Sequence, residues 1–354
     1  MSKLLALTGI VGGAIAPQLQ AQSTVRPLPI AAMPTDLDWS LAMAYAPSRA
    51  ADAPPRDTLF GRTSIDLGRI HDDTSSGEAT DQGPDVDLEL RSKWRYGSDF
   101  SDGPGRMNVV RGGWDARLGW KTAKNQGFTI NMHTEASFYD FSGATGLVPG
   151  SGTGKPLDDV YETSLGTTMC VRNSGRASWF TSAELTLSGE DHAAPGDALT
   201  VGVVAGIRYQ ANEDIAFQTG LAALTMLEDQ PWVFPYVGFD WRISERWRLG
   251  TQGSRIRLAV DLNDKWTLFG EAAYEVRQYR LNDDSPLPHG AMRDQEIDLG
   301  GGLDWRPHRG VNIGLQTGLV GWQQLEFFAR DGDKVSETES KPAPFAKLVM
   351  KFSF

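Results

Sequence analysis

The chain has 354 residues and a formal net charge of −11, and its one cysteine is Cys170. An acidic chain disfavours nucleic acid as a partner, and a single cysteine excludes an internal disulfide. The mean hydropathy is −0.33, and no later apolar run reaches the ~20 residues of a spanning helix. These features exclude a helical membrane protein and a disulfide-stapled secreted domain.

The N-terminus predicts export. Lys3 precedes an uncharged run over 4–16, Pro17 ends this run, and the small residue Ala21 follows in a polar segment. The alternative is a transmembrane anchor, but the run is too short to cross the hydrocarbon core as a helix. We therefore expect residues 1–21 to be a cleaved signal peptide, whose loss changes the net charge from −11 to −12 because Lys3 is removed.

The next segment, 22–57, is rich in proline, which removes backbone donors and disfavours both packed helices and central strands. We interpret it as a periplasmic lead-in that contains at most a short strand over 38–45. Another strand is predicted over 59–70, and residues 58–354 are expected to form one domain. The prolines are Pro27, Pro29, Pro34, Pro47, Pro54 and Pro55.

From Val86 onward, apolar and charged residues alternate at period two. Val86, Leu88 and Leu90 lie on one face of the predicted strand, and charged residues such as Asp87 lie on the other. Segments of this kind recur to the last residue, in a chain with 39 glycines. The pattern predicts an all-β fold, a transmembrane antiparallel β-barrel of about fourteen strands, within a range of roughly 12–16.

The connections between these segments differ in length. Those at 142–158, 281–292 and 329–342 are long and polar, whereas those at 212–213 and 263–264 are tight turns. Outer-membrane barrels have long extracellular loops and short periplasmic turns, and the last strand must end in the periplasm. An alternative stays open at 247–262, which could form one long strand in place of two. In that case every earlier loop would lie on the opposite side of the membrane. After 86–96, the strands are predicted over 110–121, 128–139, 159–172, 176–188, 199–211, 214–228, 232–243, 247–252, 255–262, 265–280, 293–305, 311–328 and 343–354.

The C-terminal strand carries a targeting pattern. Leu348, Met350, Phe352 and Phe354 share one face, and the chain ends on an aromatic residue. This ending resembles the terminal strand by which bacterial outer-membrane barrels are recognised and inserted. We therefore assign Phe352 and Phe354 as an insertion signal that is recognised by the barrel-assembly machinery.

The segment 247–281, WRLGTQGSRIRLAVDLNDKWTLFGEAAYEVRQYRL, resembles the strand–turn–strand core of a domain-of-unknown-function family of bacterial outer-membrane β-barrel proteins. The resemblance extends over 85–354. It implies a barrel fold and a Gram-negative outer-membrane location, but no reaction and no catalytic residue. Trp247 and Trp266 follow polar turns, and aromatic residues of this kind favour the membrane interface.

The charged parity of the strands predicts the lumen wall. Arg255 and Arg257 would face an acidic row that includes Glu271, and opposite charges on neighbouring strands attract each other. A closed lumen must pair its charges, whereas a water-filled passage tolerates unpaired ones. The predicted lumen-lining residues are Glu89, Arg91, Arg111, Arg117, His133, Glu135, Arg255, Arg257, Glu271, Glu275, Arg277, Glu296 and Asp298. The opposite parity should face lipid, and its members include Trp120, Phe239, Trp241, Leu258, Leu268, Leu299, Leu303, Leu348 and Met350.

No catalytic, metal or cofactor site is predicted. His133, Glu135 and Ser137 share one strand face, but alternate residues are about 6.5–7 Å apart along a strand, which is too far for direct hydrogen bonds between them. The acidic pairs at 72–73 and 283–284 lack the spacing of a calcium loop, and 150–155 lacks that of a phosphate loop. An enzyme is therefore less favoured than a channel or a structural barrel.

The favoured function is a pore or substrate-selective channel for small solutes, because about fourteen strands enclose more space than the eight that side chains can fill. The alternative is a structural or surface-interaction barrel with a charge-closed lumen. Expected partners are outer-membrane lipid and lipopolysaccharide, the barrel-assembly machinery and small solutes. Neither nucleic acid nor a cofactor is expected.

Overall fold

In the computed structural model, the described part of the chain comprises residues 84–123, 126–148, 155–157, 159–173 and 175–354. The predicted signal peptide, the proline-rich lead-in and the strand over 59–70 lie outside these residues. No helix within the described ranges is both long and apolar enough to cross a membrane. The strands are β1 (Asp85–Asp99), β2 (Arg106–Ala123), β3 (Gln126–Ser142), β4 (Val160–Arg172), β5 (Ala177–Glu190), β6 (Leu199–Gln210), β7 (Ile215–Met226), β8 (Asp229–Arg242), β9 (Trp247–Gln252), β10 (Arg255–Asn263), β11 (Trp266–Arg280), β12 (Ala291–His308), β13 (Val311–Phe328), β14 (Lys334–Ser340) and β15 (Ala343–Ser353).

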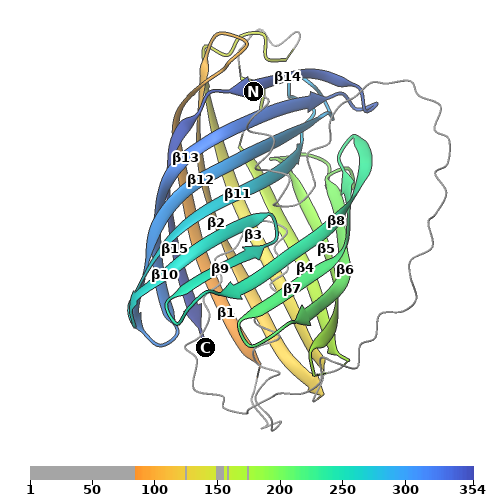
Figure 1. The fold of residues 1–354 in the computed structure, drawn as a ribbon. Helices are drawn as coiled ribbons and strands as arrows, with labels where there is room; N and C mark the ends of the chain where they lie inside the picture. Colours follow the sequence, from red (N-terminus) through yellow and green to blue (C-terminus); the bar gives the residue numbers. More distant parts are fainter. Residues whose placement is uncertain (1–83, 124–125, 149–154, 158, 174) are drawn as a thin grey trace, which may run out of the picture.

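Fourteen of these strands close into an antiparallel barrel (Figure 1). Closure comes from β15, which pairs with β1 on one edge and with β13 on the other. The predicted fold class is therefore confirmed. The fifteenth strand, β14, lies within the connection predicted over 329–342. It pairs with the upper part of β13, in line with β15, and so extends the wall beyond the closed barrel.

The two ends of the barrel differ as the loop lengths predicted. The C-terminus and the tight turns predicted over 212–213 and 263–264 share one end, and the connections that follow β3, β11 and β13 share the other, toward which the tight β7–β8 and β9–β10 turns also point (Figure 1). Residues 247–262 form two strands, β9 and β10, so the one-strand alternative is wrong. The connection between β9 and β10 falls where the strands predicted over 247–252 and 255–262 leave it. It is a tight turn in which Gly253 has a φ of 56°, a conformation that glycine adopts without strain.

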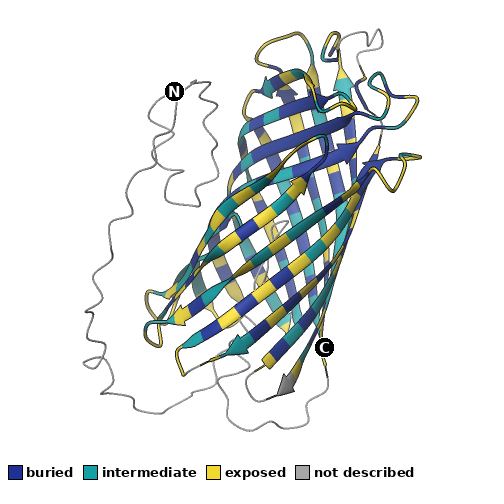
Figure 2. Ribbon diagram, turned by 90° about the vertical axis from the view of Figure 1, so that its right-hand side faces the viewer, coloured by how far each residue is buried: buried dark blue, intermediate teal, exposed yellow. Residues whose placement is uncertain are grey.

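The wall alternates between buried and exposed residues (Figure 2). Leu299 is 51% exposed and Leu268 is 48% exposed, whereas their strand neighbours Asp298 and Thr267 are buried. This follows from the two-residue period of a strand, which places successive side chains on opposite faces. Of the nine residues predicted to face lipid, Trp241, Leu258, Leu268 and Leu299 are exposed, and Trp120, Phe239, Leu303, Leu348 and Met350 are partly exposed.

An apolar cluster fills the interior at the long-loop end. Inward side chains of β2, β3, β11, β12 and β13 meet there, together with three residues of the connection after β3. The ring of Tyr139 packs edge-on against Tyr279 at a centroid distance of 6.2 Å. A packed core therefore fills the long-loop end on the side of β2–β4 and β11–β13. Its buried members are Phe100, Met107, Val109, Tyr139, Ala144, Val148, Leu157, Val160, Tyr279, Leu281, Met292, Leu325 and Phe327.

Candidate functional site

A layer of ionised side chains lies next to the apolar cluster, inside the barrel, and Glu296 of β12 is at its centre. The Glu296 carboxylate accepts hydrogen bonds from Lys93 Nζ at 2.9 Å and from guanidinium nitrogens of Arg111 and Arg277, each at 2.7 Å. Arg95 adds an ion pair at 3.5 Å. These side chains come from β1, β2, β11 and β12, and all have the inward parity of their strands. Four cations therefore surround one fully buried carboxylate.

The neighbouring acids of β12 complete this layer. Asp294 accepts hydrogen bonds from Arg111 at 2.7 Å, from the hydroxyl of Tyr139 at 2.7 Å and from Gln323 at 2.6 Å. Asp298 lies 2.5 Å from Lys93 Nζ. Because each buried carboxylate faces at least one cation, the high desolvation cost of the separate charges is offset by their mutual attraction.

A second group of ion pairs lies nearer the end of the barrel at which the C-terminus is found. Arg255 of β10 is 3.2 Å from Glu271 and 3.7 Å from Glu275 on β11. Arg257 pairs with Asp304 and stacks its guanidinium over the ring of Phe269, 3.7 Å from the centroid. The ion pair predicted between Arg255 and the acidic row is therefore present, on the inner face.

A third group surrounds His133. Its Nδ1 lies 3.0 Å from Asp115, and its Nε2 lies 3.4 Å from Glu162 on β4. Arg91 lies against the same ring and also pairs with Asp115 at 3.2 Å. Ser137 donates instead to Glu135 at 3.1 Å, so His133, Glu135 and Ser137 form no proton relay.

All thirteen residues predicted to line the lumen have the inward parity of their strands. They are buried, except Arg91, Arg117 and Arg257, which are partly buried. The structure places Glu296, Asp298, Arg111, Glu275 and Arg277 together in one layer. Arg117 lies apart, 3.9 Å from Asp87. The predicted set missed Lys93, Arg95 and Asp294, although each has the same parity as a predicted neighbour.

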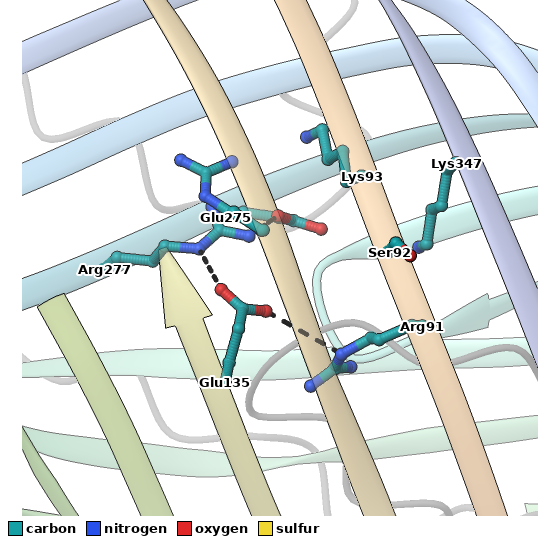
Figure 3. A pocket seen from close by; sticks show the side chains of 8 residues that line it. Arg91, Ser92, Lys93, Glu135, Glu275, Arg277 and Lys347 are labelled. Carbon is teal, nitrogen blue, oxygen red and sulfur yellow. Dashed lines mark hydrogen bonds and ion pairs between the residues drawn. The ribbon is translucent and has the colours of Figure 1, made fainter. Parts of the chain in front are cut away.

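A cavity of about 20 Å³ remains inside the charged layer, bordered by β1, β2, β3, β11 and β15 (Figure 3). Such a volume holds about one water molecule. Glu135 lies between two cations here, 3.8 Å from Arg91 and 3.7 Å from Arg277. This side of the interior is thus filled by its own ion pairs. The lining residues are Arg91, Ser92, Lys93, Arg111, Glu135, Glu275, Arg277 and Lys347.

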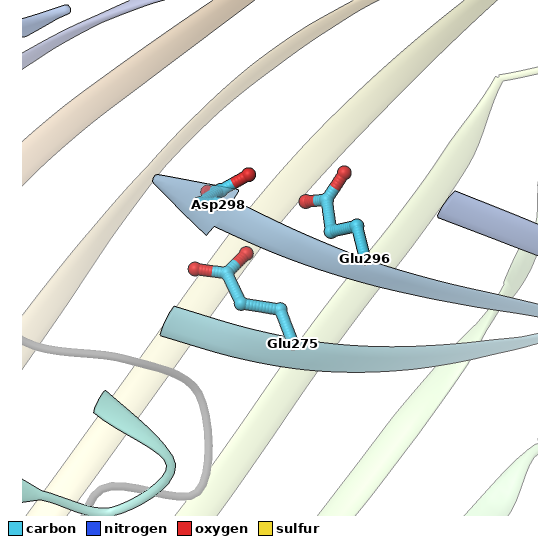
Figure 4. A group of neighbouring side chains, drawn as sticks. All are labelled: Glu275, Glu296 and Asp298. Carbon is cyan, nitrogen blue, oxygen red and sulfur yellow. The ribbon is translucent and has the colours of Figure 1, made fainter. Parts of the chain in front are cut away.

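Three carboxylates in this layer, Glu275, Glu296 and Asp298, have oxygens within 4.8 Å of one another (Figure 4). Oxygen donors of this kind suit a hard divalent cation. However, Lys93 already bridges Glu296 and Asp298, and Arg277 bridges Glu275 and Glu296. The positive charge that a metal ion would supply is provided by the chain itself, and we assign no metal to this group.

The opposite side of the interior has smaller side chains. Strand register aligns Gly206 of β6 with Gly220 of β7, and a Cβ on either glycine would collide with neighbouring atoms, at 2.3 and 2.1 Å respectively. Phe180 and Tyr236 approach each other edge-on at 5.9 Å from β5 and β8. Several other inward residues on β5–β8 are partly exposed, although Ser182, Arg208 and Ala222 of the same strands are buried. The partly exposed residues include Glu184, Thr186, Gly202, Val204, Leu224 and Phe234.

No protein-family model and no curated protein matches this chain. Among solved structures, an outer membrane channel from Pseudomonas putida F1 is similar at 8% identity and a TM-score of 0.41, covering 79% of this chain and 98% of that one. The Pseudomonas putida toluene transporter TodX is similar at 10% identity and a TM-score of 0.42, covering 77% and 90%. The KdgM porin is similar at 8% identity and a TM-score of 0.30, covering 76% and 99%. At these scores the similarities add nothing to the barrel that the strand pairings already define.

Proposed function

We propose that this protein is an outer-membrane channel for small solutes, and that one side of its lumen is filled by ion pairs while the other side provides the passage. The single observation that supports this most is the asymmetry of the interior. Most inward charged residues of β1–β3 and β11–β12 are buried in ion pairs, whereas inward residues of β5–β7 such as Thr186, Gly202 and Val204 stay partly exposed. A barrel of fourteen strands has room for both.

The charged layer also supports a polar passage. Buried ion pairs are often no more stabilising than apolar side chains of the same volume. The apolar cluster at the long-loop end shows that this barrel can fill part of its interior with apolar residues. The charges of the neighbouring layer are therefore better explained by interaction with a permeating solute than by closure of the lumen.

The proposal also covers export, insertion and the surroundings of the barrel. Residues 1–21 would direct export, Phe352 and Phe354 would be recognised by the barrel-assembly machinery, and lipid and lipopolysaccharide would surround the exposed apolar band. Membership of the domain-of-unknown-function family is supported by the segment 247–281 alone.

A second candidate, the structural barrel with a charge-closed lumen, is favoured by one observation, which is the pairing of the buried charges around a cavity of only about 20 Å³. The two candidates differ in what the charges do. In a channel they act on permeating ions, whereas in a closed barrel they act only on stability.

The test compares the wild type with the double variant Arg255→Gln/Arg257→Gln in planar lipid bilayers. Loss of two inward cations should shift the ion selectivity of a channel toward cations, because charged rings in a pore set its selectivity. A protein that shows no conductance in either form, with a lower stability of the variant, would support the closed barrel instead.

A further inference from the structure

The barrel wall has a seam between β8 and β9. Only three residue pairs join these strands, Asp240 with Gly250, Trp241 with Leu249, and Arg242 with Arg248. The ladder on the other edge of β8 continues through residue 232 to a final pair at residue 229. In the described part of the chain, the upper half of β8 therefore has no ladder partner on its β9 side.

Residues of β8 and β9 account for the backbone groups at which this ladder ends. Thr251 of β9 accepts a hydrogen bond from the backbone N–H of Phe239 at 2.7 Å and donates one to the Phe239 carbonyl at 3.2 Å. One hydroxyl thus satisfies both backbone groups that a further strand residue would have satisfied. Since the Phe239 N–H points toward β9, that of every second residue above it would do the same. Pro235 occupies one of these positions and has no N–H to leave unpaired.

The opposite rim, on β11, is capped in the same way. Tyr274 N–H donates to the Ser254 carbonyl at 3.1 Å, and the Ser254 hydroxyl donates to the Tyr274 carbonyl at 2.5 Å. Beyond Tyr274, β11 no longer pairs with β10. Its next backbone contacts are with β5, through the Ser188 hydroxyl on the Gln278 carbonyl at 2.5 Å and a parallel bridge between Arg280 and Gly189.

The tip of the β7–β8 hairpin is fastened above this gap. Glu228 pairs with Arg280 at 2.5 Å, Asp229 pairs with Arg293 at 2.7 Å, and Leu227 N–H donates to the Gln278 side chain at 2.7 Å. The gap is therefore bordered by β8, by β11, by the β9–β10 turn below and by the hairpin tip above. Figure 1 shows the β9–β10 hairpin ending well below the tip of β7–β8.

Unpaired backbone does not occur in contact with lipid unless its polar groups are satisfied or it borders a cavity. The hydroxyl caps on both rims and the proline on one satisfy part of this backbone, and the amides that remain, on Val233, Val237 and Val276, would have to border a cavity. We therefore infer that the gap between β8 and β11 is a built lateral opening of the barrel.

The side chains around the opening define what it would admit. Phe234 of β8 and Val276 of β11 border it, both partly exposed. The hydroxyls of Tyr236 and Tyr274 donate instead to Gln218 on β7 and Gln295 on β12, on the far side of each strand from the gap. The outer surface beside the gap is apolar, since Val233 is 69% exposed. On the inner face of β11, Glu275 and Arg277 alternate with Tyr274 and Val276. A solute in the opening would therefore contact apolar side chains and, one residue further along β11, fixed charges.

These features identify the solute class as a small amphiphile, with an ionised head group and an apolar body, that passes between the lumen and the lipid phase. This assignment rests on the proposed channel function and narrows it. A wholly polar solute would gain nothing from an apolar rim, and a wholly apolar one would gain nothing from the charged layer.

The opening itself is tested by hydrogen exchange of the wild-type protein in lipid nanodiscs. The backbone amides of Val233, Val237 and Val276 point into the gap and should exchange about tenfold faster than those of Val203 and Leu299, which lie within paired ladders. Equal protection of all five amides would show that the wall is closed there and would overturn the inference.

The solute class is tested with 8-anilinonaphthalene-1-sulfonate, an ionised aromatic amphiphile, as the probe for entry into proteoliposomes. Val276→Trp adds bulk at the rim, and Leu299→Trp adds the same bulk on the outer face of β12. Entry should fall by roughly threefold or more in the first and stay unchanged in the second, because only the first narrows the opening. Phe234→Trp narrows the opposite rim and serves if Val276→Trp does not assemble.

Potassium chloride conductance of the same preparations separates the two proposals. If ions pass and the probe enters equally in the wild type and both rim variants, the channel stands and the lateral route is refuted. If neither ions nor the probe pass through the wild type, the channel function fails, and the lateral route fails with it.

Discussion

At the residue scale, the interior is organised around single carboxylates that each serve several cations. Glu296 is the clearest case, because Lys93, Arg111 and Arg277 all donate to it while it is fully buried. In such an arrangement, loss of the acid and loss of one cation differ in their effect on the free energy of unfolding. Removing the shared acid leaves several buried cations with one acidic partner fewer, whereas removing one cation leaves the acid with the others.

Glu296→Ala should therefore lower the free energy of unfolding by about 3–5 kcal/mol, the usual effect of breaking a buried ion pair. Urea unfolding followed by tryptophan fluorescence measures this change. Glu245→Ala, at an exposed turn, is the matched control and should leave the stability unchanged. Equal effects of the two substitutions would mean that Glu296 is not the centre of the charged layer.

At the element scale, each strand separates a lipid-compatible face from a polar one. Leu299 lies on the outer face of β12, opposite Ala272 and Leu319 of the neighbouring strands. Thr186 lies on the inner face of β5 and is partly exposed. The same added charge should therefore have different effects on the two faces.

Leu299→Arg should destabilise the barrel by about 2–4 kcal/mol, because a charge on the lipid face is costly near the bilayer midplane. Thr186→Arg should cost less, since its side chain can reach the polar interior. The fraction of heat-modifiable barrel in outer-membrane preparations compares the two variants. Similar losses in both would argue against the assignment of faces.

The last strand makes a separate prediction at this scale. Phe354 is 80% exposed, so burial of its ring does little to explain an aromatic residue at this position by stability. Deleting it should reduce the amount of assembled barrel in the outer membrane while export across the inner membrane continues. Immunoblots of fractionated cells measure both quantities, and undiminished assembled barrel in the variant would refute the insertion signal.

At the scale of the whole molecule, the two ends of the barrel should face different compartments. Asp331 lies in the exposed connection before β14, at the long-loop end, and Asp264 lies in the tight turn between β10 and β11. Since Cys170 is buried, the natural thiol should contribute little background to labelling.

Asp331→Cys should react with a membrane-impermeant maleimide in intact cells, whereas Asp264→Cys should react only after the outer membrane is permeabilised. This follows from long loops lying outside and short turns facing the periplasm. Gel shifts of the labelled protein measure the reaction. The reverse pattern would invert the proposed orientation and, with it, the location of the apolar cluster.

The sequence alone predicted which residues share a strand face and, once 247–262 is divided into two strands, how many strands form the barrel and which connections share an end. These properties depend on the two-residue period of a strand and on loop length, which are local. Parity therefore placed Arg255 and Glu271 on one face, and their pairing across neighbouring strands followed from it. The division of 247–262 into two strands stayed open until the register was known.

Only the tertiary structure decided which inward residues meet across the barrel. Lys93 and Glu296 are far apart in sequence, and they meet only because closure brings β1 opposite β12. The contact between β5 and β11, and with it the lateral gap, also depends on how far β9 and β10 rise in the wall. Parity carries no information on these distances, because they are set by the stagger and curvature of the whole sheet rather than by any one strand.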